Sequence, residues 1–425
     1  MEQKSLRQKD RDYVWHPLTQ HKTSGEMMPI ARAQGALLFD PEERSYIDGI
    51  SSWYTAVYGH CHPELIGAVR AQMETLDQVV FSGFTHRPAV QLAEQLLAVL
   101  PGDMSKVFYS DNGSTATEIG IKMALQYHFN RGEKRSVLLA FEEGFHGDTF
   151  GAMSVSGLSV YNGPFEDFFL EVKRIPVPTA DNKLEVLKRA EQLLQEHAVA
   201  GFIYEPLVQG AAGMKIYDAS ALDQLLGMMQ AKGVICIADE VMTGFGKTGS
   251  LFASSQLQHT PEIICLSKAL SAGMVPMAAT ACSEKIYQAF YADEIAKGFF
   301  HGHTYTANPL ACTAARKALE LLQSDEIQQG IRRIRTANEL FAAEMKNNPK
   351  VTNVRTLGVI FALDLNIQMD RYGNLRDKMY RAFMERGVFL RPLGQTIYTL
   401  PPYVTSIDQL ERIFQSIREV VDLID

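Results

Sequence analysis

The sequence lacks long apolar runs. No stretch of its 425 residues approaches the roughly 18 consecutive apolar residues that a membrane-spanning helix requires. The N-terminal segment MEQKSLRQKDRDYVW is charged and has no apolar core, so it does not have the pattern of a secretory signal. We therefore expect a protein that works in the cytoplasm and does not associate with a membrane.

Cysteine is also scarce. The sequence has five cysteines, an odd number, at scattered positions: Cys61, Cys236, Cys265, Cys282 and Cys312. Two of them, Cys236 and Cys265, lie inside apolar, strand-like runs. This distribution favours buried free thiols in a reducing compartment over a framework of disulfides.

Positive charge is not in excess. The formal net charge is -8, which argues against a nucleic-acid partner. Hydrophobic residues make up 46% and charged residues 21% of the chain, the balance of a folded globule. Internal repeats and low-complexity linkers are absent from the sequence. The length predicts two domains, or one large domain with a smaller lobe.

The middle of the chain contains a regular alternation. Short β-branched runs alternate with longer helical patterns, and the runs occupy residues 136–141, 201–206, 233–241, 262–267 and 277–283. Apolar runs of this length, separated by helices, predict a mainly parallel sheet that is covered on both faces. The expected fold class is therefore α/β.

The two ends of the chain have a different pattern. Within residues 30–50, short alternating runs flank a DPEE turn, which predicts a small antiparallel hairpin. From about residue 325 a charged helical stretch is followed by strand-like segments and a final amphipathic helix. We expect a large domain over residues 56–325, and a smaller α+β domain built from residues 1–55 and 326–425.

Two ionisable residues of opposite sign follow neighbouring strands of the predicted sheet. Asp239 ends the run VICIAD, and Lys268 follows the run IICLS, 29 residues later. That spacing accommodates one crossover between strands. Ligands of open α/β sheets bind beyond the carboxyl ends of the strands. We therefore expect Asp239 and Lys268 to face one pocket.

This pair fits the chemistry of pyridoxal phosphate. The cofactor needs a lysine amine for a Schiff base, an acid that keeps its ring nitrogen protonated, an anion site for its phosphate and an aromatic face for its ring. Lys268 fits the first need and Asp239 the second. Taken alone, Lys268 is more typical of a surface lysine, and Asp239 is equally typical of a helix cap or a structural ion pair.

Two further segments fit the remaining needs. In SDNGSTATEIG, Thr115 and Glu118 are predicted to form a capping box, which leaves Gly113 and Ser114 at the positive end of a helix dipole as a phosphate site. Phe145 lies between a glycine and His-Gly on the loop after residues 136–141, where it could face the ring. Ordinary helix capping and a core phenylalanine are the alternative interpretations.

The stretch IADEVMTGFGKTGSLFASSQLQHTPEIICLSKALSAG resembles the cofactor-attachment signature of class III aminotransferases. It departs only conservatively, at Glu262, and the resemblance extends over nearly the whole chain. It implies a fold-type I enzyme, a homodimer with its active site at the subunit interface. Lys268 would hold pyridoxal phosphate and shuttle the proton, and Asp239 would pair with the pyridinium nitrogen.

The resemblance also implies contacts to the rest of the cofactor. Gly113 and Ser114 would bind the phosphate, and Phe145 would stack on the ring. Thr304 of the partner subunit would add to the phosphate site, and His303 would also contact the cofactor. His146, next to Phe145, is expected to be structural.

Within the class, the chain is most similar to the members that convert 8-amino-7-oxononanoate to 7,8-diaminononanoate in biotin biosynthesis. The stretches that carry this similarity are WHPLTQ, DGISSWYTAVYGHCHPEL, GFHGDTFGAMSV, YEPLVQGAAGM, HGHTYTANPLAC and RPLGQTIYTLPPY. They imply that Trp53, Gly302 and Phe145 contact substrate and that Arg391 pairs with its carboxylate. The reaction would proceed in two halves through pyridoxamine phosphate.

Three departures from the pattern concern the amino donor. Phe145 stands where tyrosine is usual, so stacking survives but a hydrogen bond of about 0.5–1.5 kcal/mol is lost. Leu18 replaces an aromatic residue that contacts S-adenosylmethionine in some members, and Lys247 replaces an arginine. S-adenosylmethionine is the expected donor, and lysine, which some relatives use, is the alternative.

Other signals in the sequence are weaker. GFGKTG is not a Walker loop, because Val241 occupies the position of its first glycine. HCH (60–62) and HGH (301–303) lack partners at metal-ligand spacing, so we expect no metal. Ala211 stands where ornithine and 4-aminobutyrate aminotransferases carry a glutamate, which disfavours those activities. Another ω-amine (for example diamine) aminotransferase and a non-catalytic cofactor-binding protein remain the alternatives.

Overall fold

A seven-stranded sheet forms the centre of the larger part of the molecule. The computed structural model describes residues 4–159, 162–367 and 374–424. The sheet has the order β4-β12-β11-β10-β7-β5-β6. Its strands are β4 (Met104–Ser110), β5 (Val137–Phe141), β6 (Val172–Ile175), β7 (Val199–Tyr204), β10 (Ile235–Asp239), β11 (Ile263–Leu266) and β12 (Ala278–Ser283). Every neighbouring pair is parallel except the two that involve β12, so the predicted mainly parallel α/β sheet is confirmed.

The five predicted runs became β5, β7, β10, β11 and β12, but β4 and β6 were not predicted. Both missed strands lie at the edges of the sheet, and both carry charged residues, such as Lys106 and Lys173. An edge strand is only partly buried, so its sequence has no continuous apolar run for a pattern search to find.

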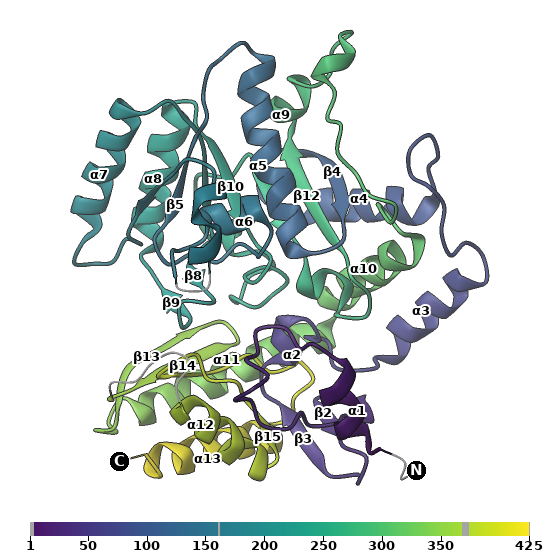
Figure 1. Ribbon diagram of the computed structural model, residues 1–425, viewed down its shortest axis with the longest axis vertical. Helices are drawn as coiled ribbons and strands as arrows, with labels where there is room; N and C mark the ends of the chain where they lie inside the picture. The colour runs from purple at the N-terminus through teal and green to yellow at the C-terminus, as the bar shows by residue number, and fades with distance from the viewer. Residues whose placement is uncertain (1–3, 160–161, 368–373, 425) are drawn as a thin grey trace.

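Helices cover both faces of this sheet (Figure 1). In β10, Ile235 and Ile237 pack with residues of α5, whereas Cys236 and Ala238 join the cluster that includes α8. The helices of this part are α3 (Pro63–Met73), α4 (Arg87–Val99), α5 (Gly113–Asn130), α6 (Phe150–Val155), α7 (Lys183–Glu196), α8 (Ala219–Ala231), α9 (Glu284–Gln288) and α10 (Pro309–Leu322). Alternating side chains thus bury each strand on two sides, as a parallel sheet requires.

Segments from both ends of the chain pack together below the large sheet in Figure 1. The strands are β1 (Arg32–Gln34), β2 (Leu37–Phe39), β3 (Ser45–Asp48) and β15 (Val388–Phe389), and separately β13 (Val351–Leu357), β14 (Ile360–Leu365) and β16 (Thr396–Thr399). The helices are α1 (Leu6–Tyr13), α11 (Asp325–Met345), α12 (Asn374–Glu385) and α13 (Ile407–Asp422). The hairpin predicted within residues 30–50 is β2–β3.

The pairing of β3 with β15 joins the two ends of the chain. Val388 lies beside Ile47, and Phe389 lies beside Asp48, in parallel register. The helical and strand-like pattern predicted after residue 325 corresponds to α11, β13, β14, β16 and α13. The predicted domain boundaries after residues 55 and 325 stay predictions.

Two further observations concern the composition. Among the described residues, no helix has both the length and the apolar character needed to cross a membrane. All five cysteines are free thiols, and only Cys61 is exposed.

A pair of helical glycines tests the packing of α11. A Cβ at Gly330 would lie 2.1 Å from the carbonyl oxygen of Tyr403, whereas a Cβ at exposed Gly67 in α3 would meet nothing within 4 Å. We expect Gly330→Ala to lower the free energy of unfolding by about 1–3 kcal/mol. Gly67→Ala should raise it by about 0.5–1 kcal/mol, because glycine disfavours a helix. Denaturant unfolding measures both; shifts of equal sign would contradict the packing.

Candidate active site

Lys268 lies two residues after the end of β11, at the first position of the short 3-10 helix η3 (Lys268–Ser271). Its Nζ lies 5.1 Å from the centroid of the Tyr54 ring. Within the described residues, the amine has no hydrogen-bond or ion-pair partner. Burial lowers the pKa of Lys268, and the carboxyl groups of Asp239 and Glu205 oppose that shift. A lowered pKa leaves more of the amine unprotonated, which is the form that attacks a carbonyl carbon.

Asp239 is the last residue of β10, the strand that pairs with β11. One carboxylate oxygen, Oδ1, accepts a hydrogen bond from the backbone N–H of Val241 at 3.0 Å. The other, Oδ2, lies 2.7 Å from Nδ1 of His146. Both side chains are buried. Asp239 is therefore held in one orientation. Its carboxyl group opposes the lowering of the pKa of Lys268 that burial causes.

His146, which was expected to be structural, lies against the carboxyl group of Asp239. Its Nδ1 contacts Asp239, and its Nε2 is buried without a partner among the described residues. The sequence shows only that His146 follows Phe145 on a loop, and nothing in that position indicates a contact to a residue 93 positions later. The contact arises because β5 and β10 end at the same edge of the sheet.

Glu205 also lies at this site, although its position in the sequence did not indicate it. Its Oε1 accepts the backbone N–H of Phe145 at 3.0 Å, and its Oε2 accepts the backbone N–H of Gly210 at 2.9 Å. Burial and, more weakly, the charge of Asp239 raise the pKa of Glu205 to about 7, while His146 and the two N–H groups act in the opposite direction. Glu205 thus connects the loop of Phe145 to the pocket.

The predicted capping box at the start of α5 is wrong. Asn112 is the N-cap: its side chain accepts the backbone N–H of Thr115, whose hydroxyl accepts the backbone N–H of Asn112. Glu118 instead accepts the N–H groups of Gly151 and Ala152, at 2.7 and 3.1 Å, in the first turn of α6. The S/T-x-x-E pattern was satisfied in sequence, but a neighbouring helix supplied a better set of donors.

Gly113 and Ser114 form the first turn of α5, where backbone N–H groups are free of helical partners. The loop that carries Phe145 packs against this turn. A Cβ at Gly147 would lie 2.1 Å from Oγ of Ser114, and the backbone N–H of Asp148 donates to that oxygen at 3.2 Å. The structure therefore brings the candidate phosphate site, the aromatic loop and Asp239 together.

The side chain of Phe145 is 44% exposed, so it is not a core phenylalanine. The backbone that carries it is fixed by Glu205 on one side and by His146 and Gly147 on the other. An exposed ring on an anchored loop can present its face to a ligand.

Arg391 and Trp53 lie together although 338 positions separate them in the sequence. The guanidinium carbon of Arg391 is 4.8 Å from the Trp53 ring. Within the described residues, Arg391 has neither a carboxylate partner nor a hydrogen-bond acceptor. A cation held by an aromatic face and left without a counter-ion is suited to bind a carboxylate.

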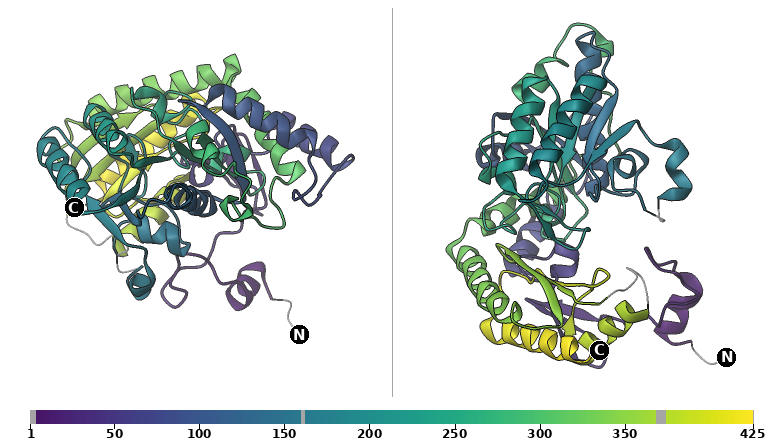
Figure 2. Two further views of the ribbon diagram at one scale, coloured as in Figure 1. Left: turned by 90° about the horizontal axis from the view of Figure 1, so that it is seen from above. Right: turned by 90° about the vertical axis from the view of Figure 1, so that its left-hand side faces the viewer.

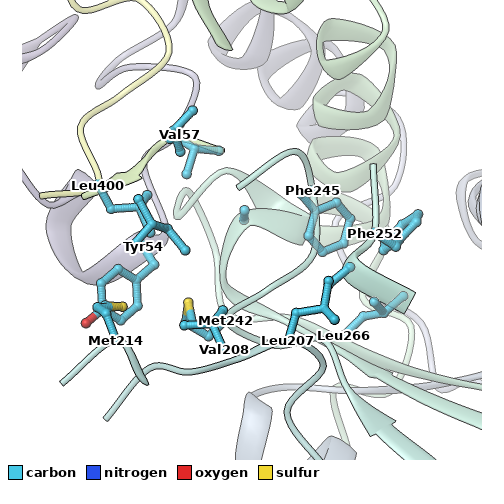
Figure 3. Packing of buried hydrophobic residues seen from close by; sticks show 14 of the residues in the cluster. Tyr54, Val57, Leu207, Val208, Met214, Met242, Phe245, Phe252, Leu266 and Leu400 are labelled. Carbon is cyan, nitrogen blue, oxygen red and sulfur yellow. The ribbon is translucent and has the colours of Figure 1, made fainter. Parts of the chain in front are cut away.

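Trp53 and Tyr54 are neighbours on α2 (Ser51–Tyr54), the segment that follows β3. Trp53 contacts Arg391, and Tyr54 contacts Lys268. Tyr54 also donates a hydrogen bond from its hydroxyl to the Tyr398 hydroxyl at 3.0 Å. Figure 3 shows Tyr54 in the buried hydrophobic cluster, together with Met214 and Met242. The turn therefore links Arg391 and Lys268 in one site.

Gly302, His303 and Thr304 are not brought to Lys268 of the same chain. Gly302 and Thr304 are exposed. The carbonyl oxygen of Thr304 accepts a hydrogen bond from the Gln78 side chain, and Nε2 of His303 lies 4.0 Å from Asp111. This loop thus runs past the residues that precede α5, with its threonine facing outward.

Leu18 and Lys247, the two other departures from the class pattern, differ in their exposure to solvent. Leu18 is exposed on the N-terminal segment. Lys247 is fully buried, and its Nζ donates to the carbonyl oxygen of Gly244 at 3.0 Å. Burial and the nearby Lys268 lower the pKa of Lys247 far below its usual value. Lys247 therefore lies inside the fold, behind the site.

Comparisons with known proteins agree with this geometry. The family described as Aminotransferase class-III matches residues 19–421. The chain is 43% identical to adenosylmethionine-8-amino-7-oxononanoate aminotransferase of Synechococcus elongatus over 423 residues, which cover 96% of this chain and 98% of the relative. It is 33% identical to the Helicobacter pylori protein of the same name over 435 residues, 99% of this chain and 98% of that one.

Solved structures give the same result. The crystal structure of adenosylmethionine-8-amino-7-oxononanoate aminotransferase from Methanocaldococcus jannaschii has a TM-score of 0.93 and 31% identity, with 99% of each chain covered. An amine transaminase from an uncultivated Pseudomonas species, in its PLP-bound form, has a TM-score of 0.91 and 26% identity, with 97% of this chain and 99% of that chain covered.

The raised pKa of Glu205 predicts a pH dependence. Between its ordinary value near 4.5 and about 7, the folded chain keeps the proton that the unfolded chain has lost, so the free energy of unfolding falls as pH rises. Glu205→Gln removes this term. Relative to the wild type, the variant should gain about 2–3 kcal/mol between pH 4.5 and 7. Urea unfolding of the cofactor-free protein measures the difference; parallel pH curves would contradict the assignment.

Proposed function

Because the chain belongs to the class III aminotransferases, we propose that it transfers an amino group to 8-amino-7-oxononanoate and releases 7,8-diaminononanoate, a step of biotin biosynthesis. The names of its curated relatives support this acceptor, and they support S-adenosylmethionine as the donor. Their similarity extends over nearly the full length of both chains, so it includes the elements that line the site.

One structural observation carries the proposal. The guanidinium of Arg391, which is unpaired among the described residues, lies beside the turn Ser51–Tyr54, and the same short segment contacts the partly buried amine of Lys268. An enzyme for 8-amino-7-oxononanoate needs an amine to work on the substrate's carbonyl end and a cation to bind its carboxylate. Lys268 and Arg391 supply these two groups in one site.

The residues fit pyridoxal phosphate as the cofactor. Lys268 offers a partly buried amine that lacks a partner among the described residues, and Asp239 offers a carboxylate fixed by two contacts. When bound, the cofactor supplies an aldehyde that takes up the donor's amino group and a ring that withdraws electrons. Gly113 and Ser114 would bind its phosphate, and Phe145 would face its ring.

Lys268 is the acid–base group. Its lowered pKa favours the neutral amine, the form that would hold the aldehyde carbon of the cofactor. In the first half of the reaction Nζ would accept the proton from the donor carbon that carries the amino group and pass it to that cofactor carbon. In the second half, in which the keto acceptor receives the amino group, the same nitrogen would move a proton in the opposite direction.

Asp239 would pair with the ring nitrogen. A carboxylate beside this nitrogen would stabilise the positive charge on which electron withdrawal depends. His146 and the N–H of Val241 hold the carboxylate in place. Asp239 can therefore act without rotating into an unproductive orientation.

The substrate side of the pocket consists of Trp53, Gly302 and Arg391. Arg391 pairs with the carboxylate of 8-amino-7-oxononanoate, and Trp53 supports the guanidinium with its ring. Gly302 and Thr304, which are exposed in a single chain, reach the site from the partner subunit of a homodimer. His303 and Thr304 there add to the cofactor site.

Exposed aromatic side chains support the homodimer. Phe300 and Tyr305, which flank Thr304 in the sequence, are 75% and 65% exposed. Aromatic residues are enriched in protein interfaces. The enzyme works in the cytoplasm, its partners are small molecules, and residues 1–55 with 326–425 form the small domain.

The reaction itself is tested in two half-reactions. The purified enzyme, reconstituted with pyridoxal phosphate, is mixed with S-adenosylmethionine or with lysine, and the visible absorbance of the cofactor is followed. S-adenosylmethionine should convert the absorbance of the pyridoxal phosphate form into that of the pyridoxamine phosphate form. 8-Amino-7-oxononanoate should then restore the original absorbance. Conversion by lysine alone would contradict the donor, and conversion without restoration would contradict the acceptor.

Replacing the catalytic lysine provides the second test. Lys268→Ala should lower turnover by at least about a thousandfold, because proton transfer loses its base. Lys285→Ala, in which the lost amine is a surface group paired with Glu262, is the matched control and should keep full activity. Full turnover in Lys268→Ala would contradict the assignment.

Arg391 predicts a specific loss of acceptor binding. Arg391→Ala should raise KM for 8-amino-7-oxononanoate about 10–100-fold, the range for a charged hydrogen-bonded pair. The KM of Arg391→Lys should lie between those of the wild type and Arg391→Ala, because lysine keeps the positive charge but not the planar, bidentate guanidinium. Arg386→Ala is the control, since that guanidinium is already paired with Glu419. An unchanged KM in Arg391→Ala would place the carboxylate elsewhere.

A further inference from the structure

Four consecutive residues of the candidate site, Ser51–Tyr54, have a left-handed backbone. Ser51, Ser52, Trp53 and Tyr54 have φ values of 49°, 44°, 65° and 72°. Residues with a Cβ rarely adopt this conformation, and a run of four is rarer because each residue adds its own steric cost. Such a turn persists only where the surrounding structure holds it.

This turn carries the two aromatic rings of the site. Trp53 lies against the guanidinium of Arg391, and Tyr54 lies against the amine of Lys268. In a right-handed turn the two side chains would leave in other directions, so the left-handed conformation decides where both rings lie. The carboxylate site and the lysine site therefore depend on one strained segment.

A cluster of three polar side chains, Asp48, Ser52 and His60, contacts the turn. Oδ2 of Asp48 accepts a hydrogen bond from the Ser52 hydroxyl at 2.8 Å and lies 2.7 Å from Nε2 of His60. Oδ1 of Asp48 accepts the backbone N–H of Ile50 at 3.2 Å. The Ser52 hydroxyl also lies 3.5 Å from Nε2 of His60. Asp48 is completely buried.

The cluster is anchored in the sheet that carries Arg391. Asp48 is the last residue of β3, its backbone N–H donates to the Ala36 carbonyl at 2.8 Å, and its Cα partner in β15 is Phe389. Arg391 follows Phe389 by two residues. A side chain that is fixed at Asp48 is thus fixed relative to the chain segment that presents the guanidinium.

We propose that Asp48, Ser52 and His60 form a clamp that holds the left-handed turn, and that this clamp sets the distance between the carboxylate-binding face of Trp53 and the lysine-facing ring of Tyr54. The three are positioning residues. Within the described residues they make no hydrogen bond or ion pair to Lys268 or Arg391. Their effect on catalysis passes through Trp53 and Tyr54, and that part of the proposal rests on the proposed function.

Other contacts of the turn let the clamp be loosened without unfolding the site. The Ser51 hydroxyl donates to the Leu400 carbonyl at 2.7 Å, and the Tyr54 hydroxyl donates to Tyr398. The Ser52 carbonyl accepts a hydrogen bond from the Thr55 hydroxyl at 2.9 Å. These bonds do not involve Asp48. Loss of the clamp should leave the backbone of the turn attached and free the Ser52 side chain, so that the adjacent Trp53 ring gains mobility.

Tryptophan fluorescence tests the clamp independently of activity. The sequence has two tryptophans, so a Trp15→Phe background leaves Trp53 as the single reporter. In that background Ser52→Ala and Asp48→Asn should raise the acrylamide quenching constant of Trp53 about twofold, because its ring becomes more mobile on the nanosecond timescale. The measurement uses the full-length holoenzyme, and its thermal midpoint is recorded for each variant.

Asp40→Asn is the matched control. Asp40 is equally buried, also closes a turn next to β3, and accepts the backbone N–H groups of Glu42 and Arg44. It does not contact Ser52 or His60. Asp40→Asn should lower the thermal midpoint as a buried-carboxylate change does but leave the quenching of Trp53 unchanged. If Asp48→Asn does not fold, Ser52→Ala provides the same measurement.

Kinetics then connect the clamp to the site. In Ser52→Ala, KM for the carboxylate-bearing acceptor should rise about tenfold, with a smaller fall in kcat, because Arg391 loses its aromatic support. Unchanged Trp53 quenching in folded Ser52→Ala and Asp48→Asn proteins would overturn the clamp, and so would an equal rise in Asp40→Asn. Absence of turnover in the wild type would instead overturn the proposed function, while the fluorescence result would still decide the clamp.

Discussion

The site depends on one electrostatic arrangement: a carboxylate and an amine at the carboxyl ends of two adjacent parallel strands. Asp239 and Lys268 are both largely removed from water, where an unpaired charge is costly. His146 and the N–H of Val241 hold the carboxyl group of Asp239 in place. Burial lowers the pKa of Lys268, and the carboxyl groups of Asp239 and Glu205 oppose that shift. The opposite demands on these two groups are met within one pocket.

The second constraint is the junction between the two parts of the molecule, which Figure 2 shows from two further directions. The turn Ser51–Tyr54 comes from the N-terminal segment, Lys268 from the large sheet, and Arg391 from the C-terminal segment. Tyr54, which belongs to the turn, touches the large sheet side through Lys268 and the C-terminal segment through Tyr398. A short strained turn therefore brings together Lys268 and Arg391, which the large sheet alone could not combine.

The fold by itself does not choose the substrate. Amine transaminases at about a quarter identity share this architecture, with a TM-score of 0.91 for the Pseudomonas enzyme. A shared scaffold does not by itself set specificity, which comes from the side chains of the site. In this chain Arg391, which has no ion-pair or hydrogen-bond partner among the described residues, lies against Trp53.

The sequence alone determined the features that depend on local pattern: the buried strands, the residues at their ends, and Phe145 on a loop. Asp239 and Lys268 were predictable because a strand's end is visible in the chain itself. The residues that contact these groups in the folded chain were not predictable. His146 and Glu205 reach the site from loops that only the sheet order brings together, and Glu118 caps α6 instead of α5 because that helix lies beside it. Backbone handedness at Ser51–Tyr54 was equally hidden, since no glycine marks it. Local sequence sets which groups are available, and tertiary contacts decide which of them meet, because hydrogen bonds and charges act over a few ångströms in space, whatever the separation along the chain.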